Sequence, residues 1–393
     1  MAKLNEIFIK SFSGEWGAED LDGTGTPVLR TTNFTNHGVI NYTDVVTRNI
    51  KKKNISDKYL SKGDIIIEKS GGSDKQPVGR VVFFDGEEGK YLFNNFTGLL
   101  RVKNKDEWLP RYVFYALFAN YCVGGTRRYE NRTTGLHNLQ LDAYLSGTEI
   151  KKRNYEIQIE IVNNLDKVSE LIGRFKEQLQ DFDLLIKSRF IELFGDPVSN
   201  PKNWAKKAIK EFATDVRYGT SKPAIEGGRY PYLRMNNLTY DGRLDLSDLK
   251  YIDIPDNELE KCVVKYGDIL FNRTNSIELV GKTCLFEFNY PMVIAGYIIR
   301  IRLNDRVTPL YLTTYMNLEF MKKQLRNMAK GAVNQANINA QEMQSIIVPV
   351  PPLDLQNQFA DFVEEVNKSK LEVQKSLEEL ETLKKSLMQQ YFG

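Results

Sequence analysis

Polar and basic residues gather in short loops at matching places in the two halves of the chain. Arginine, asparagine, glutamine and lysine side chains can hydrogen-bond to the edges of DNA bases, and serine and threonine hydroxyls suit phosphate oxygens. These residue types predict a nucleic-acid contact surface, although ordinary solvated loops have a similar composition. The candidates in the first half are Arg30, Thr32, Asn33, Lys69, Ser70, Ser73, Lys75, Gln76, Arg80, Arg127, Arg128 and Arg132. Those in the second half are Arg234, Asn236, Asn237, Asn272, Arg273, Thr274, Asn275, Lys330, Asn334 and Gln335.

Motifs that would indicate catalysis are incomplete. Gly281-Lys282-Thr283 resembles the end of a phosphate-binding loop, but Ser276 stands where that motif needs glycine. The two histidines, His37 and His137, fall in a predicted turn and a predicted polar loop, which argues against a histidine general base. We therefore expect no catalytic residues and no metal site in this chain. A stand-alone nuclease or methyltransferase with an unfamiliar site is the enzymatic alternative, and a coiled-coil adaptor without a DNA role is the other.

The elements that position these loops repeat along the chain. Leu29-Arg30-Thr31-Thr32-Asn33 returns as Leu233-Arg234-Met235-Asn236-Asn237, and Gly63-Asp64-Ile65-Ile66 returns as Gly267-Asp268-Ile269-Leu270, both 204 residues later. Val78-Gly79-Arg80 returns as Val280-Gly281-Lys282 after 202 residues. Similar loops with different letters indicate two related domains that contact different sequences.

Apolar runs bounded by glycine and aspartate predict strands at 65–67, 81–84, 269–271 and 293–303. Helices are expected at 112–121 and 310–328, each after a proline. Two further tracts have apolar residues in alternating steps of three and four, which is typical of a coiled-coil seam. The first seam consists of Leu165, Val168, Ile172, Phe175, Leu179 and Phe182, and the second of Val363, Val366, Val373, Leu377 and Leu380.

The predicted fold is α+β, with two tandem mixed domains separated by two long helices. We expect the helices to pair as an antiparallel coiled coil with pseudo-two-fold symmetry. The predicted boundaries are 1–152 and 197–350 for the domains, and 153–196 and 351–393 for the helices. Gly195 and Pro197 end the first helix in this prediction, because glycine caps helices and proline cannot continue them.

Composition gives weaker constraints. The net charge is +3, but the helical tracts 161–195 and 359–393 are slightly acidic, so the basic excess lies in the domains. This distribution favours domains that contact phosphates and helices that contact protein. The three cysteines lack metal-ligand spacing. No apolar run reaches membrane-spanning length and no secretion signal is apparent, so we expect a cytoplasmic protein.

The chain resembles the specificity subunits of type I restriction-modification systems over essentially its whole length. The resemblance rests on the repeated motifs above, on Phe-Gly-Asp-Pro at 194–197 and on Val-Pro-x-Pro-Pro-Leu-x-x-Gln at 348–356. It differs at 153–158, where the first helix begins without a Pro-Pro pair.

The resemblance implies two target-recognition domains, each of which reads one half of a gapped site in double-stranded DNA. It implies that the helices bind two methyltransferase subunits, which carry S-adenosylmethionine and modify adenine. Separate restriction subunits, which use ATP and Mg²⁺, accompany some members of this family. The chain itself is expected to hold no cofactor.

Overall fold

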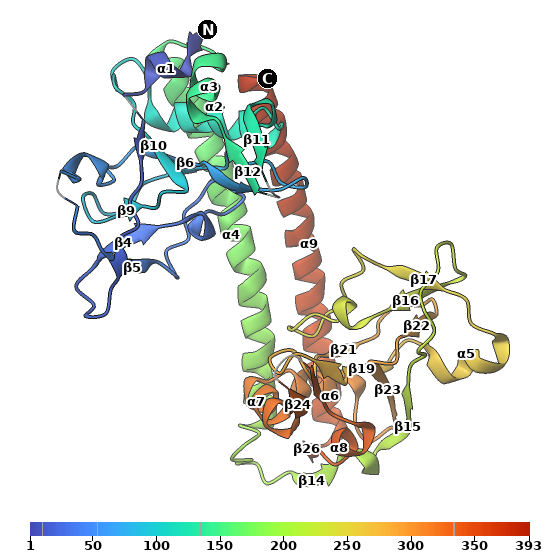
Figure 1. Ribbon diagram of the computed structural model, residues 1–393. Helices are drawn as coiled ribbons and strands as arrows, with labels where there is room; N and C mark the ends of the chain where they lie inside the picture. Colours follow the sequence, from blue (N-terminus) through green and yellow to red (C-terminus); the bar gives the residue numbers. More distant parts are fainter. Residues whose placement is uncertain (10, 53, 134–135, 333–334) are drawn as a thin grey trace. The chain divides into compact units, whose positions relative to one another are not determined.

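The computed structural model describes residues 1–9, 11–52, 54–133, 136–332 and 335–393. These residues form two compact units (Figure 1). Unit 1 consists of Met1–Lys176 and Lys375–Gly393, and unit 2 consists of Glu177–Gln374. Each unit contains a mixed domain and one portion of each of two long helices.

Unit 1 contains three small sheets and one strand pair. The first sheet has the order β2-β10-β6-β8, formed by Phe12–Ser13, Thr97–Leu100, Ile65–Glu68 and Val81–Phe83. The second has the order β3-β5-β4-β9, formed by Ala18–Glu19, Val46–Asn49, Thr26–Leu29 and Leu92–Phe93. The third has the order β11-β12-β7, formed by Glu130–Thr133, Leu136–Leu139 and Ser70–Gly72, and β1 (Ala2–Lys3) pairs with β13 (Glu149–Ile150). Its short helices are α1 (Leu4–Ile7), α2 (Pro110–Cys122) and α3 (Leu141–Gly147).

Unit 2 has the same kinds of sheet. The first has the order β15-β23-β19-β21, formed by Ala213–Tyr218, Ile298–Leu303, Ile269–Asn272 and Thr283–Leu285. The second has the order β17-β16-β22-β18, formed by Lys250–Ile252, Tyr230–Leu233, Met292–Ile294 and Val263–Val264. The third has the order β20-β25-β24, formed by Thr274–Asn275, Gln335–Asn337 and Lys330–Ala332, and β14 (Ala205–Ala208) pairs with β26 (Ile347–Val350). Its short helices are α5 (Asp256–Cys262), α6 (Pro309–Met316), α7 (Glu319–Met328) and α8 (Ala340–Gln344).

The sequence repeat is therefore also a repeat of strand order. One parallel pair occurs at the same place in each second sheet, β4 with β9 and β16 with β22. Among the described residues, the second sheets differ at their margins. Unit 2 has only an isolated bridge, Ile225 with Tyr251, where unit 1 has β3, and no strand of unit 1 corresponds to β18.

The central strands β6 and β19 are buried on both faces. In β6, Ile65 and Ile67 pack into one core with α2, whereas Ile66 packs into a second core with Leu29. In β19, Ile269 and Phe271 pack into one core and Leu270 into another. A strand buried on both faces has a continuous apolar run rather than an alternating one. The predicted strands at 65–67, 81–84 and 269–271 and the predicted helix at 112–121 are confirmed.

Two 40-residue helices complete the fold, α4 (Tyr155–Phe194) and α9 (Leu353–Phe392). In unit 1 the start of α4 lies beside the end of α9, where Asn164 Nδ2 donates to Tyr391 Oη at 3.2 Å. In unit 2 the end of α4 lies beside the start of α9, where the rings of Phe190 and Phe359 are 5.4 Å apart. Gly195 follows the last residue of α4 with a φ of +81°, as predicted for a glycine cap.

The seam residues are most buried toward the ends of the helices. Leu165, Val363, Val366 and Leu377 are buried, whereas Phe175, Leu179, Phe182, Val373 and Leu380 are half-buried. Val168 and Ile172 are also buried.

Two predicted elements are wrong in detail. The segment 293–303 is not one strand, because β22 ends at Ile294 and the chain turns before β23 begins at Ile298. The segment 310–328 is not one helix, because Asn317 separates α6 from α7. The Asn317 side chain donates to the carbonyls of Thr283 (2.7 Å) and Thr313 (2.9 Å), which holds the break against β21.

Candidate nucleic-acid interface

The third sheet of each unit joins two of the loops that the sequence singled out. In unit 1, β7 carries Ser70 and pairs with β12, so the loop after β6 lies against the β11–β12 hairpin. In unit 2, Thr274 of β20 pairs with Asn337 of β25 in the same way. The paired segments are about 60 residues apart along the chain, and the sheet makes them one surface.

In unit 1 this surface presents exposed polar and basic side chains. Ser73, Lys75, Arg127 and Arg128 are exposed, and Gln76 is half-buried. Arg127 Nη2 donates to the carbonyl of Asp74 at 3.2 Å, and the Arg128 guanidinium lies 4.8 Å from the Tyr129 ring centre. Both guanidinium groups are therefore held near the sheet while they still face solvent.

In unit 2, more of the side chains on the equivalent surface contact residues of their own domain. Lys330 and Gln335 are exposed, whereas Arg273 is half-buried with its guanidinium 4.9 Å from the Tyr218 ring centre. Thr274 Oγ1 donates to Asn337 Oδ1 at 3.2 Å, and Asn275 Nδ2 donates to Asn272 Oδ1 at 2.8 Å.

The Leu-Arg-x-x-Asn motifs form turns in which the asparagine is internal. Asn33 is buried, and its Nδ2 donates to the carbonyls of Asn41 (3.1 Å) and Asp44 (3.0 Å). Asn237 does the same with Asp245 (2.8 Å) and Asp248 (3.5 Å). These amides shape the turns, and the exposed residues of the motif are Thr32 and Asn236.

The arginines of these motifs are also partly occupied. Arg30 Nη2 lies 3.3 Å from Asp44 Oδ2, and Arg234 Nη2 lies 2.8 Å from Asp248 Oδ2. Both guanidinium groups are half-buried beside exposed carboxylates. They stiffen the turns that present Thr32 and Asn236.

Other candidate residues lie within the domains rather than on the surface. Arg80 Nη2 donates to Glu68 Oε1 (3.1 Å) and to the carbonyl of Thr31 (3.0 Å). Asn272 is fully buried, and its Nδ2 donates to the carbonyls of Thr274 and Tyr297, both at 3.1 Å. Lys69 is half-buried, and this desolvation lowers the pKa of its ammonium. The Arg132 side chain and Asn334 lie outside the described residues.

His137 is not in a polar loop, contrary to the prediction. It lies in β12 and is 5% exposed, with its ring packed beside Glu130. Alternation along β12 turns this side chain inward, and the sequence gives no sign of the carboxylates that meet it.

Sequence reasoning also missed a basic surface on α7. Lys322, Lys323 and Arg326 lie on this helix, and the Lys322 ammonium is 3.6 Å from the ring centre of Tyr240. Burial, followed by the nearby Lys187, lowers the pKa of Lys322 to about 8. The spacing of three and four residues between these basic side chains is the signal that could have identified the surface.

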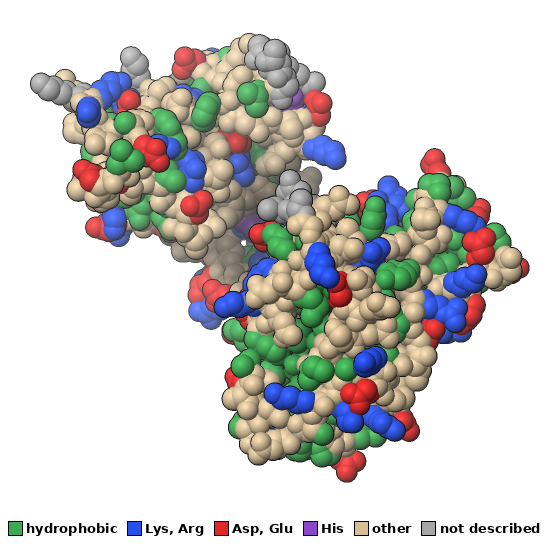
Figure 2. Space-filling model, turned by 60° about the horizontal axis from the view of Figure 1, so that its bottom comes forward, with side chains coloured by type: hydrophobic (Ala, Val, Ile, Leu, Met, Phe, Trp, Pro, Cys, Tyr) green, Lys and Arg blue, Asp and Glu red, His purple; other side chains and the backbone are tan. Residues whose placement is uncertain are grey.

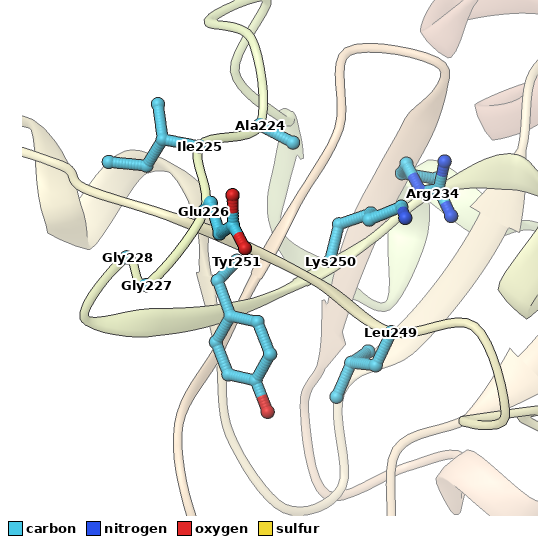
Figure 3. A pocket seen from close by; sticks show the side chains of 9 residues that line it. All are labelled: Ala224, Ile225, Glu226, Gly227, Gly228, Arg234, Leu249, Lys250 and Tyr251. Atoms are coloured by element: carbon cyan, nitrogen blue, oxygen red, sulfur yellow. The ribbon is translucent and has the colours of Figure 1, made fainter.

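A groove of about 770 Å³ lies beside the second sheet of unit 2 (Figure 3). It is lined by the loop 224–228 and by Arg234, Leu249, Lys250 and Tyr251. Lys250 Nζ lies 3.3 Å from Asp248 Oδ1, and Arg234 pairs with the same carboxylate. Both cations share the single Asp248 carboxylate, and Glu226 also lines the groove, so the charges of these four side chains balance.

On the face shown in Figure 2, basic side chains are interspersed with acidic ones. In the described part of the chain, no group of three or more His, Cys, Asp or Glu residues could hold a metal ion. No helix among the described residues is long and apolar enough to cross a bilayer.

Comparison with known proteins identifies relatives of this chain. Residues 201–382 match the type I restriction modification DNA specificity domain family. The putative type I restriction enzyme MjaX specificity subunit of Methanocaldococcus jannaschii is 30% identical over 197 residues, which are 49% of this chain and 46% of that protein. The type I restriction enzyme EcoKI specificity subunit of Escherichia coli is 23% identical over 86% of this chain and 75% of its own length.

The chain is therefore similar to type I restriction enzyme specificity subunits. Its match spans about half the length of the MjaX subunit. The crystal structure of an S subunit from M. genitalium has this fold at a TM-score of 0.53 and 15% identity, covering 100% of this chain and 95% of that one. A chain from a study of complex assembly in the type I system has a TM-score of 0.57 at 16% identity, covering 100% and 96%.

Proposed function

We propose that this chain is the DNA-specificity subunit of a type I restriction-modification complex. Each unit reads one half of a bipartite, gapped site in double-stranded DNA. The observation that carries this proposal is the third sheet of each unit, which joins two separate polar loops into one surface. Phosphate contacts from the exposed lysines and arginines would position the DNA, and neighbouring amides and guanidinium groups would read base edges.

The two long helices, in this proposal, form an antiparallel coiled coil with pseudo-two-fold symmetry and bind two methyltransferase subunits. The contacts between opposite helix ends in each unit support the antiparallel arrangement. Leu185 and Leu383 occupy equivalent positions 198 residues apart and are 46% and 45% exposed. Exposed leucines at equivalent positions suit two copies of one partner, because burial of apolar area drives association.

The chain would supply recognition and no chemistry. S-adenosylmethionine would bind the partner methyltransferase, and ATP and Mg²⁺ would bind restriction subunits where these are present.

The test is a methylome. The chain is co-expressed with its neighbouring methyltransferase subunit in a methylation-free host, and modified adenines are mapped by single-molecule sequencing. A bipartite gapped motif that requires this chain is expected. Arg128→Ala and Arg273→Ala should relax opposite halves of that motif. No new methylation from a soluble, assembled complex would contradict the proposal, and turnover by the purified chain alone would favour an enzyme.

A further inference from the structure

His137 lies in a buried contact between two carboxylates in unit 1. Its Nδ1 is 2.9 Å from Glu130 Oε2, and its Nε2 is 3.6 Å from Asp74 Oδ1. The Glu130 side chain is 1% exposed, whereas the Asp74 side chain is 84% exposed. The imidazole thus joins a carboxylate inside the third sheet to a carboxylate on the surface loop 73–78.

The Glu130 carboxylate and the Asp74 backbone also hold this loop in place. Glu130 Oε1 accepts a hydrogen bond from the Val78 amide at 3.0 Å, at the end of the loop. The Asp74 carbonyl accepts one from Arg127 at 3.2 Å. The Ser73 amide donates to the Gln76 carbonyl at 2.7 Å, which closes a tight turn with Lys75 at its exposed tip.

Unit 2, which contains no histidine, lacks this arrangement of an imidazole between two carboxylates. The Leu139 amide bonds to the carbonyl of Lys69, and the Ile338 amide bonds to that of Arg273, the residue 204 positions after Lys69. Counting back two residues along each strand aligns His137 with Ala336, which is 1% exposed. Extending the β24–β25 register by one residue aligns Glu130 with Ala329. The unit 2 loop is held by neutral amide and hydroxyl contacts instead.

We propose that His137 is a positioning residue, which holds the loop 73–78 in the conformation that reads DNA. Base discrimination in one half-site, the half read by unit 1, depends on it. The inference rests on the proposed function, since it assigns a determinant of specificity to one of two reading domains. His137 acts through Lys75 and Gln76 and does not itself face the surface.

The experiment compares methylomes of the assembled complex with wild-type chain and with His137→Ala. The preference for the cognate base over single mismatches should fall by roughly tenfold in one half-site, because each mismatch normally reduces binding by about five- to 150-fold. The other half-site should keep its preference. Glu149→Ala, an exposed position in β13 outside the third sheet, is the control and should change neither half.

A second variant separates positioning from folding. Removing His137 alone leaves the buried Glu130 carboxylate without its imidazole, which destabilises the domain. Glu130→Ala/His137→Ala reproduces the residues of unit 2 and removes that charge. It should recover the melting temperature of the wild type and still show the relaxed half-site.

The outcomes are distinct. A wild-type methylome without a bipartite motif would contradict the proposed function itself. A normal wild-type motif that stays unchanged in the folded double variant would overturn only the positioning role. Equal loss of methylation at all sites, or relaxation of the half-site that Arg273→Ala affects, would also overturn it.

Discussion

At the scale of single residues, the motif that repeats most clearly between the two halves acts inside the fold. Arg101 donates from Nε and Nη2 to the two carboxylate oxygens of Asp64 (2.8 and 2.7 Å). Arg302 pairs with Asp268 in the same way (2.8 and 3.2 Å). The aspartate of each Gly-Asp-Ile motif therefore fastens one strand of the first sheet to its neighbour. Its repetition reflects a shared scaffold rather than a shared DNA sequence.

Gln356 gives a stability prediction at this scale. It is fully buried, and its Oε1 accepts from the Thr308 amide (2.8 Å), while its Nε2 donates to the carbonyls of Arg306 (3.1 Å) and Pro351 (2.9 Å). Gln356→Ala leaves these backbone groups unpaired and should reduce the free energy of unfolding by about 3 kcal/mol. Urea denaturation measures this change. Gln178→Ala, at an exposed position on α4, should have little effect.

Lys322 gives a pH prediction. Its pKa of about 8 in the folded protein lies below the unfolded value of about 10.4. Between these pH values the unfolded chain binds more protons, so this residue makes stability rise with pH. The melting temperature of the wild type should therefore rise relative to that of the Lys322→Met variant as the pH increases from 8 to 10. A difference that stays constant over this range, or that also appears for the exposed Lys323→Met, would contradict the assignment.

At the scale of elements, each long helix has some leucines that are buried and others that are exposed. Leu377 is 6% exposed and Leu383 is 45% exposed, although both lie in the last part of α9. The exposed leucines are available to a partner, whereas the buried ones are not. A matched pair of substitutions can separate these roles.

Leu377→Asp should place an unpaired carboxylate at a buried position. This should reduce the free energy of unfolding by several kcal/mol, as is typical for an unpaired buried charge. The melting temperature should fall, and the complex should lose the fixed spacer of its methylation motif. Leu383→Asp should keep the melting temperature and weaken binding of the proposed methyltransferase partner, as measured by size-exclusion chromatography. Retention of the same spacer by the Leu377→Asp complex would argue against a rigid helical frame.

Elements with strong local signals could be predicted from the sequence. The periodic tracts predicted long helices within 153–196 and 351–393, and continuous apolar runs predicted β6 and β19. The break at Asn317 and the burial of His137 could not be predicted, because their partners lie far away in the sequence. Thr283 is 34 residues from Asn317, and Asp74 is 63 residues from His137. Asn33 and Asn272 were predicted to contact DNA, but their amides donate to backbone carbonyls nearby in the sequence, a turn geometry that residue type alone does not reveal.

At the scale of the whole molecule, charge is divided between the parts. The helical tracts 161–195 and 359–393 carry a small negative charge, although the chain as a whole has +3. Cations in the domains can displace counterions from DNA, whereas the helices are poorly suited to do so. The salt dependence of DNA binding should therefore be determined by residues of the domains rather than of the helices.

Lys75→Ala in the assembled complex should weaken DNA binding at all sequences and reduce the slope of log K against log salt by about one, as expected for one lost phosphate contact. Fluorescence anisotropy at several salt concentrations measures this slope. Lys167→Ala, at an exposed position on α4, is the control and should leave the slope unchanged. An equal change in both variants would mean that the effect comes from net charge rather than from a contact.

The strand pairs that close each domain have an evolutionary consequence. Ala2 pairs with Ile150, and Ala205 pairs with Val350, so each domain is entered and left at one place. A recombination event with its two crossovers at such a pair exchanges an entire domain and leaves the helices intact. If the chain has the proposed function, new DNA specificities can arise in this way in single genetic steps, without intermediates that have lost the proposed partner subunits. The strand pairs that close each domain are therefore suited to the exchange of whole domains, whereas the buried contacts within the fold are suited to being retained.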